Sequence, residues 1–191
     1  AEFALFHLIG GGRNYPVMAR SIAAGTMETP WGRSLHGSRV CVIGLGGIGT
    51  ALVRLLAPFG CEVVGVKRTP DPALTAELGL TELFPADGLT EAVRDCPFVV
   101  AAVPLNGETE GLIGAQVLAA MPDDGVLVNV SRGPVVDQQA LMDTLNAGRL
   151  WAVGLDVFWT EPMDPSDPLF EFDVLATPHA ASACDRFLNG T

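Results

Sequence analysis

Residues 40–49 read VCVIGLGGIG, and no other part of the chain restricts the possible folds as much. An apolar run leads into Gly44, Gly46 and Gly49 in G-x-G-x-x-G spacing, and an apolar-periodic segment over 48–58 follows. The first glycine of such a unit permits a tight turn, the second lets the backbone approach a pyrophosphate, and the third lets helix and strand pack closely. The pattern therefore predicts a dinucleotide-binding βαβ unit. A merely tight turn is the alternative.

Short apolar runs alternate with helical stretches along the rest of the chain. Continuous apolar runs are typical of strands that are buried on both faces of a parallel sheet. We expect strands over 39–43, 62–66, 82–84, 98–103, 125–130, 152–157 and 174–178. We also expect helices over 114–121 and 136–147, with Gly148 just past the end of the second. This alternation predicts an α/β fold with a Rossmann-type doubly wound parallel sheet.

The first segment, 2–24, precedes the first predicted strand and is apolar over much of its length. Three consecutive glycines and Pro16 interrupt it. We interpret this segment as a packing helix with a kink, and an arm that reaches a second subunit is the alternative. His7 lies inside it and His36 lies in the loop before the first strand. We expect both histidines to be structural or exposed.

The composition excludes several classes of function. The 191 residues carry a formal net charge of −11, which argues against nucleic acid or an anionic membrane as a partner. No apolar run reaches the roughly 18 to 20 residues of a membrane span. Three widely separated histidines lack ligand spacing, so we expect no metal site. Without a C-x-x-C pair we expect reduced thiols, three of them in the core of a cytoplasmic protein, at Cys41, Cys61, Cys96 and Cys184.

The only lysine of this acidic chain stands beside an arginine at the end of the second predicted strand. About 20 positions after the glycines, an Asp or Glu usually contacts the adenine ribose. Here Lys67 and Arg68 occupy that place and Thr69 follows. Two cations and a hydroxyl suit a 2′-phosphate, which favours NADP over NAD. In the alternative reading they are solvated charges, with Asp71 or nothing at the ribose.

Polar residues follow three of the later predicted strands. Arg132 lies in VNVSRGPVVD, Asp156 and Glu161 lie in GLDVFWTEP, and His179 lies in ATPHAAS. Parallel sheets bind ligands at the carboxyl ends of their strands. We therefore expect these four side chains to converge on the nicotinamide end of a bound dinucleotide.

Taken together, these motifs resemble the D-isomer-specific 2-hydroxyacid dehydrogenase family. The resemblance rests on AEFALFHLIGG, VIGLGGIG, VPLNGETEGLIG, LVNVSRGPVVD, GLDVFWTEP and TPHAA, which occur in the family's order between residues 1 and 182. It implies an enzyme of two Rossmann-like domains, in which the nucleotide domain is inserted in the substrate domain and makes most of a homodimer's contact. It also implies that Arg132, Glu161 and His179 are catalytic, and that Asp156 holds the nicotinamide carboxamide.

These residue types suit the implied reaction, the interconversion of a 2-oxo acid and a D-2-hydroxy acid by hydride transfer. His179 can accept the hydroxyl proton and return it in reduction. Glu161 would bond the other ring nitrogen and fix the tautomer, and Arg132 would bind the substrate carboxylate and polarise the C2 oxygen. A nucleotide-sensing binding module, like the family's corepressor relatives, is the alternative, because those relatives keep the three residues.

The expected cofactor contacts extend along one edge of the sheet. They comprise Gly44, Gly46, Gly47, Ile48, Gly49, Lys67, Arg68, Thr69, Val103, Pro104, Thr109, Val130, Arg132, Asp156, His179 and Ala181. NADP is the preferred cofactor and NAD the second choice. Many family members have arginine where this chain has Gly47, so one phosphate contact is lost here.

We expect residues 1–191 to form one NAD(P)-binding domain of a normally two-domain enzyme. Residues 1–25 would be a leading hinge or dimer helix, and 183–191 a return segment of a largely absent substrate domain. The long helix that the family places after Ser182 is replaced by ACDRFLNGT. We therefore expect the chain to bind cofactor but to be inactive alone.

Overall fold

In the described residues, 1–27 and 31–184 of the computed structural model, the chain forms one seven-stranded parallel sheet. The strand order is β3-β2-β1-β4-β5-β6-β7, so the chain crosses from one edge back to the centre after β3. This is a doubly wound sheet, and the predicted fold class is confirmed. The strands are β1 (Arg39–Ile43), β2 (Glu62–Val66), β3 (Glu82–Phe84), β4 (Phe98–Ala101), β5 (Val126–Asn129), β6 (Ala152–Leu155) and β7 (Val174–Ala176).

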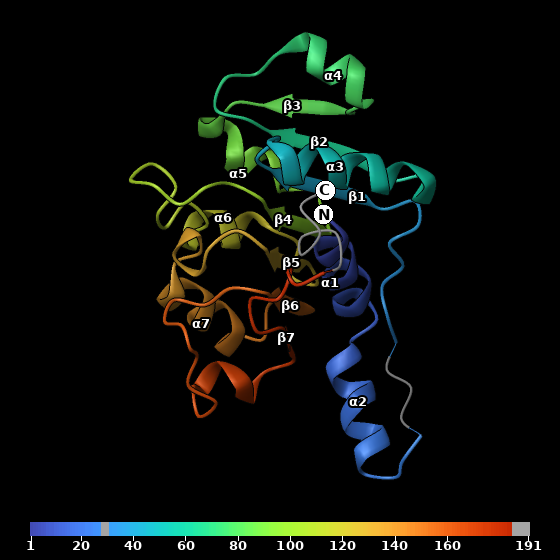
Figure 1. The fold of residues 1–191 in the computed structure, drawn as a ribbon, viewed down its shortest axis with the longest axis vertical. Coiled ribbons are helices and arrows are strands. Elements are labelled where there is room, and N and C mark those ends of the chain that lie inside the picture. The colour runs from blue at the N-terminus through green and yellow to red at the C-terminus, as the bar shows by residue number, and fades with distance from the viewer. Residues whose placement is uncertain (28–30, 185–191) are drawn as a thin grey trace.

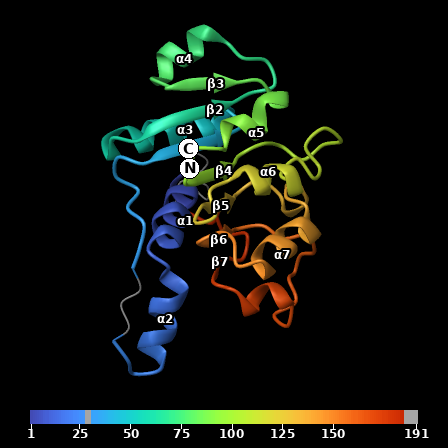
Figure 2. The same ribbon diagram turned by 180° about the vertical axis from the view of Figure 1, so that it is seen from behind.

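Helices cover both faces of the sheet (Figures 1 and 2). They are α1 (Glu2–Gly12), α2 (Tyr15–Ala23), α3 (Gly47–Leu56), α4 (Pro72–Leu78), α5 (Leu89–Ala92), α6 (Ala115–Ala120) and α7 (Gln138–Asn146). Single 3₁₀ turns occur at η1 (Ala57–Phe59), η2 (Ala86–Gly88), η3 (Gly133–Val135) and η4 (Pro168–Glu171). Helices α4 and α5, of seven and four residues, were not predicted from the sequence.

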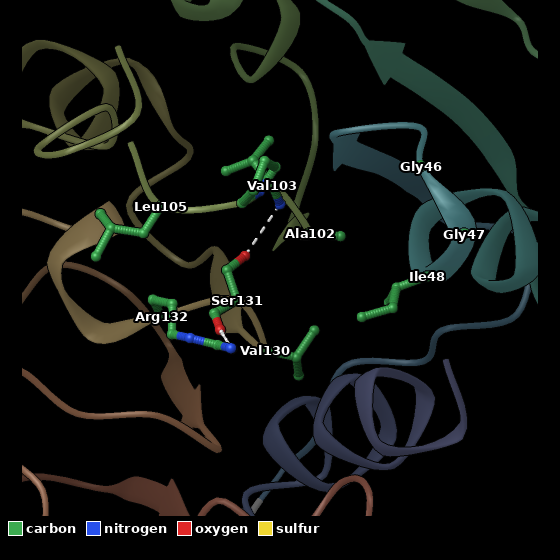
Figure 3. A pocket seen from close by; sticks show the side chains of 10 residues that line it. Gly46, Gly47, Ile48, Ala102, Val103, Leu105, Val130, Ser131 and Arg132 are labelled. Carbon is green, nitrogen blue, oxygen red and sulfur yellow. Dashed lines mark hydrogen bonds between the residues drawn. The ribbon is translucent and has the colours of Figure 1, made fainter. Parts of the chain in front are cut away.

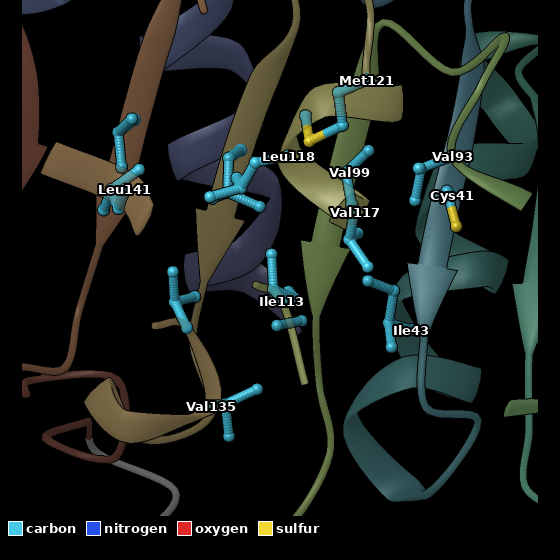
Figure 4. Close-up of a cluster of buried hydrophobic side chains, with 14 of the residues drawn as sticks. Cys41, Ile43, Val93, Val99, Ile113, Val117, Leu118, Met121, Val135 and Leu141 are labelled. Atoms are coloured by element: carbon cyan, nitrogen blue, oxygen red, sulfur yellow. The ribbon is translucent and has the colours of Figure 1, made fainter. Parts of the chain in front are cut away.

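Alternate residues of the strands belong to two separate apolar layers, one on each face of the sheet. On β1, Val40 and Val42 face α1 and α3, whereas Cys41 and Ile43 face the layer of α5, α6 and α7. Figure 4 shows side chains of this second layer packed between the strands and α6 and α7. Every central strand is thus buried on both faces, which explains its continuous apolar sequence.

The later strands are shorter than predicted at their carboxyl ends. The apolar run over 98–103 leaves the sheet after Ala101, and the run over 152–157 leaves it after Leu155. The remaining residues of both runs lie in the loops at the carboxyl edge and are partly or fully buried there. The apolar sequence therefore extends beyond the ends of these strands, and the predicted boundaries were wrong by one or two residues.

The first segment forms two helices and not one kinked helix. The break lies at Asn14, which has φ 51°, downstream of the three glycines, which remain helical within α1. Pro16 begins α2, where a missing backbone N–H costs nothing. Helix α1 packs on β5, β6 and β7, whereas α2 extends beyond the edge of the sheet (Figure 1).

All four cysteines lie in the described part of the chain and are free thiols, as predicted. Cys41 and Cys96 are buried, but Cys61 is only half-buried and Cys184 is exposed, so the core holds two cysteines and not three. Within the described residues, no helix combines the length and apolarity needed to cross a membrane. Of the predicted return segment, residues 185–191 lie outside the described part.

Candidate dinucleotide cleft and catalytic cluster

A cavity of about 620 Å³ opens at the carboxyl edge of the sheet, between the ends of β1 and β4 (Figure 3). This is the point where the strand order reverses, at which doubly wound sheets bind ligands. Its predicted lining residues are Gly46, Gly47, Ile48, Val103, Pro104, Val130 and Arg132. Ala102, Leu105 and Ser131 also line it and were not predicted.

The glycine turn shapes one side of the cavity. Gly44 has φ +98°, which favours glycine, and a Cβ atom at Gly49 would lie 1.9 Å from the Gly44 carbonyl oxygen. Helix α3 therefore begins directly against the end of β1. A Cβ at Gly46 or Gly47 would meet nothing within 4 Å, and no side chain caps the N-terminus of α3. This arrangement fits a dinucleotide pyrophosphate, which the positive end of a helix attracts.

Ser131 builds the opposite side of the cavity. Its Oγ accepts a hydrogen bond of 3.1 Å from the Val103 backbone N–H, which ties the loop after β4 to the loop after β5 (Figure 3). The Arg132 guanidinium donates back to the Ser131 carbonyl at 2.6 Å. In the loop after β4, Thr109 Oγ1 donates to the Pro104 carbonyl at 2.6 Å. Thr109 therefore shapes this loop without lining the cavity.

Lys67 and Arg68 lie beside the glycine turn. The Gly44 N–H donates to the Val66 carbonyl at 2.9 Å, which joins the turn to the end of β2 just before Lys67. Arg68 Nη1 lies 3.1 Å from Glu108 Oε2, in an ion pair whose side chains are 78% and 70% exposed. Asp71 caps α4 by accepting from the Ala73 N–H at 2.9 Å. A pair this exposed is weak, so Arg68 can exchange Glu108 for another anion.

His179 and Glu161 are joined across two loops at the same edge. His179 Nδ1 lies 2.8 Å from Glu161 Oε2, and Glu161 Oε1 accepts from the Phe158 N–H at 3.0 Å. The hydrogen bond to His179, followed by that from Phe158, lowers the pKa of Glu161. Because Glu161 is therefore an ionised acceptor, Nδ1–H of His179 is the donor and Nε2 is left for other chemistry. Both side chains are about 40% exposed.

Arg132 lies beside this pair because Gly133 permits a close approach. A Cβ atom at Gly133 would lie 2.1 Å from the Phe158 carbonyl carbon, so only glycine lets the loops after β5 and β6 touch. The positive charge of Arg132 lowers the pKa of Glu161 further. The three residues predicted to be catalytic are thus brought together, and their catalytic roles stay predictions.

Asp156 is buried and holds the loop after β7. It accepts hydrogen bonds from Thr177 Oγ1 at 2.6 Å, the Ala180 N–H at 2.9 Å and the Ala181 N–H at 3.1 Å. The predicted contact of Asp156 with a nicotinamide carboxamide stays a prediction. Thr177 was not predicted as a site residue, because the predicted strand over 174–178 included it, whereas β7 ends at Ala176. In the described residues, no group of three or more metal-ligating side chains is assembled.

The doubly wound sheet, the glycine turn and the cavity at its switch point define a Rossmann-type dinucleotide-binding domain. Residues 5–181 match the family described as D-isomer specific 2-hydroxyacid dehydrogenase, NAD binding domain. This match covers most of the chain, and the chain belongs to this family.

Two curated relatives and one solved structure illustrate the similarity. The chain is 36% identical over 190 residues to a glyoxylate reductase of Korarchaeum cryptofilum, covering 96% of this chain and 56% of the relative. It is 38% identical over 197 residues to a D-3-phosphoglycerate dehydrogenase of Mycobacterium tuberculosis, with 97% and 36% covered. A D-isomer specific 2-hydroxyacid dehydrogenase from Xanthobacter autotrophicus Py2, in complex with NADPH and MES, has a TM-score of 0.83 and 36% identity, with 97% and 75% covered. The chain therefore spans about half or less of the length of these curated relatives.

Proposed function

We propose that the full-length protein containing this chain is an NAD(P)-dependent oxidoreductase that interconverts a 2-oxo acid and a D-2-hydroxy acid. One observation carries the proposal: the hydrogen-bonded pair of His179 and Glu161, with Arg132 adjacent, opens on the same sheet edge as the glycine turn. Family membership and the relative named glyoxylate reductase support a 2-oxo acid as the substrate class.

Each residue of the cluster has a distinct task in this proposal. The nicotinamide cofactor, when bound, supplies or accepts the hydride. His179 Nε2 gives a proton to the C2 oxygen during reduction and removes it during oxidation. The Glu161 carboxylate keeps Nδ1 protonated and holds the ring in place. Arg132 binds the substrate carboxylate, since a guanidinium matches that group in shape and charge.

The test is an absorbance assay at the nicotinamide band, with the full-length protein, NADPH or NADH, and a panel of small 2-oxo acids. We expect oxidation of the reduced cofactor with at least one of these acids, and only the D product. Tight cofactor binding with no turnover across the panel would contradict the proposal and would favour the nucleotide-sensing module.

We further propose NADP as the preferred cofactor. Lys67 and Arg68 follow β2 beside the glycine turn, where a carboxylate would repel a 2′-phosphate. The Xanthobacter structure was solved in complex with NADPH, which supports this choice.

The 191-residue chain alone is expected to bind reduced cofactor but to show little turnover. It contains the cavity and the His179 pair, but that pair is open to solvent, and an open site loses orientation and electrostatic stabilisation. Fluorescence titration with NADPH and the absorbance assay on the same sample check this. Turnover by the chain alone at the rate of the full-length protein would contradict it.

We also propose a homodimer formed through α1, α2 and their neighbours. Phe6, Ile9, Tyr15 and Ile22 expose large apolar side chains on these two helices, and an isologous contact would cover them. Sedimentation at micromolar concentration is expected to give a dimer. Ile22→Asp is expected to shift it toward monomer, whereas Ala76→Asp on α4, which adds the same charge elsewhere, is not. A wild-type monomer would contradict the proposal.

A further inference from the structure

His7 is fully buried beneath the sheet, although it lies far in sequence from every predicted site residue. It projects from α1 toward β6, where Gly154 leaves room for its ring. A Cβ atom at Gly154 would lie 2.9 Å from His7 Nδ1 and 3.0 Å from its Cβ. The ring is therefore held against the strand that ends just before Asp156.

A chain of hydrogen bonds leads from His7 to Asp156. His7 Nε2 lies 2.9 Å from Thr177 Oγ1, and Thr177 Oγ1 donates to Asp156 Oδ1 at 2.6 Å. A threonine hydroxyl has a single proton, and a carboxylate can only accept. Because that proton is committed to Asp156, His7 must donate from Nε2–H. Its Nδ1 has no hydrogen-bond partner in residues 1–27 and 31–184, as suits an unprotonated nitrogen.

His7 acts here as a neutral donor. Burial lowers the pKa of His7 to about 4, and the charge of Asp156 and the Leu175 carbonyl oppose this only in part. The ring is therefore uncharged near neutral pH. His7 therefore contributes one directed N–H donor and no positive charge.

Asp156, the last member of this hydrogen-bond series, binds residues on both sides of His179 in the sequence. Asp156 receives the Thr177 hydroxyl before His179 and the Ala180 and Ala181 N–H groups after it. His179 itself has φ 54°, a left-handed conformation that is uncommon for a residue with a side chain and that is favoured by constraint from neighbouring contacts. The Asp156 contacts supply that constraint, and they depend on which way the Thr177 hydroxyl points.

We propose that His7 is a positioning residue, which acts through Thr177 and Asp156 to hold the loop of residues 177–181 and thereby the ring of His179. Its effect on turnover rests on the proposed function. Its effect on the loop does not, so the two can fail separately.

The first test compares His7→Gln, which can still donate to Thr177, with His7→Leu, which fills similar space without a donor. We expect amide hydrogen exchange at Ala180 and Ala181 to be about tenfold faster in His7→Leu and close to wild type in His7→Gln. In the wild-type chain, ¹⁵N chemical shifts of His7 should show Nε2 protonated and Nδ1 not. Equal exchange in the two variants, or the opposite tautomer, overturns the proposal.

Thr177→Val and Thr177→Ser provide a second pair should His7→Leu fail to fold. Valine has the shape of threonine without the hydroxyl, so Thr177→Val should speed exchange at Ala180 and Ala181 as His7→Leu does. Thr177→Ser restores the hydroxyl and should return exchange close to the wild-type rate. Unchanged exchange in Thr177→Val overturns the proposal.

In the full-length protein we expect His7→Leu to lower kcat about tenfold, with a smaller change in KM for the cofactor and with rescue in His7→Gln. A change in KM alone overturns the positioning role in turnover. Faster exchange in a protein that shows no dehydrogenase activity even as wild type contradicts the proposed function and supports the positioning of the loop.

Discussion

Replacing His179 with alanine in the full-length protein is expected to lower kcat by about 10² to 10⁴-fold, the usual contribution of a general acid–base residue. Cofactor affinity should change far less, because the cavity is lined by the glycine turn, the loop after β4 and the loop after β5. The ring of His179 is held by Glu161 at 2.8 Å, so alanine removes the proton donor and leaves Glu161 with its Phe158 contact. Steady-state kinetics and a fluorescence titration with reduced cofactor provide the two measurements.

His36 offers a matched control for this substitution. It is exposed in the loop before β1, away from the carboxyl edge, and His36→Ala should leave kcat unchanged. A His179→Ala enzyme with a near-normal rate would remove His179 from the mechanism. It would also remove the main reason for treating Glu161 as its partner.

Replacing Lys67 with aspartate and Arg68 with alanine should move the cofactor preference from NADPH toward NADH. Each charge-assisted hydrogen bond to a phosphate contributes about 1.5 to 3 kcal/mol, which is at least about tenfold in binding. The new carboxylate should also repel a 2′-phosphate and accept from a ribose hydroxyl. We therefore expect the ratio of kcat/KM for NADPH to that for NADH to fall by about 10²-fold or more.

Two single variants test whether this effect belongs to the site. Arg54 forms a similarly exposed ion pair with Glu77 between α3 and α4, so Arg54→Ala should leave the cofactor ratio unchanged. Glu108→Gln removes the partner of Arg68 and should favour NADPH by a fewfold, because Arg68 then no longer exchanges one anion for another. A wild-type preference for NADH, or a ratio that the double variant does not move, would mean that Lys67 and Arg68 are only surface charges.

Local sequence patterns determined the fold class and most of the sheet edge. Buried parallel strands must be apolar on both faces, so β1 and β4 were recognisable from their continuous apolar sequence. The turn at Gly44 was equally readable, because its φ of +98° and the close approach of Gly49 demand glycine at that spacing. The convergence of Arg132, Glu161 and His179 followed from the rule that parallel strands end at one edge.

Contacts between distant segments could not be read in this way. Ser131 and Thr177 are ordinary hydroxyl residues in sequence, and each becomes a site residue only through a partner on another loop or strand. Gly133 looks like any turn glycine until the loop after β6 is packed against it.

His7 and Thr177, 170 positions apart, illustrate the division most clearly. Periodicity and turn chemistry act over a few residues, so the sequence by itself determined where strands, helices and the glycine turn form. Only the tertiary structure decided that α1 lies under β6 and that a gap at Gly154 admits the His7 ring. Hydrogen-bond partners depend on positions matched to a few tenths of an ångström, and the packing of whole helices on the sheet sets those positions.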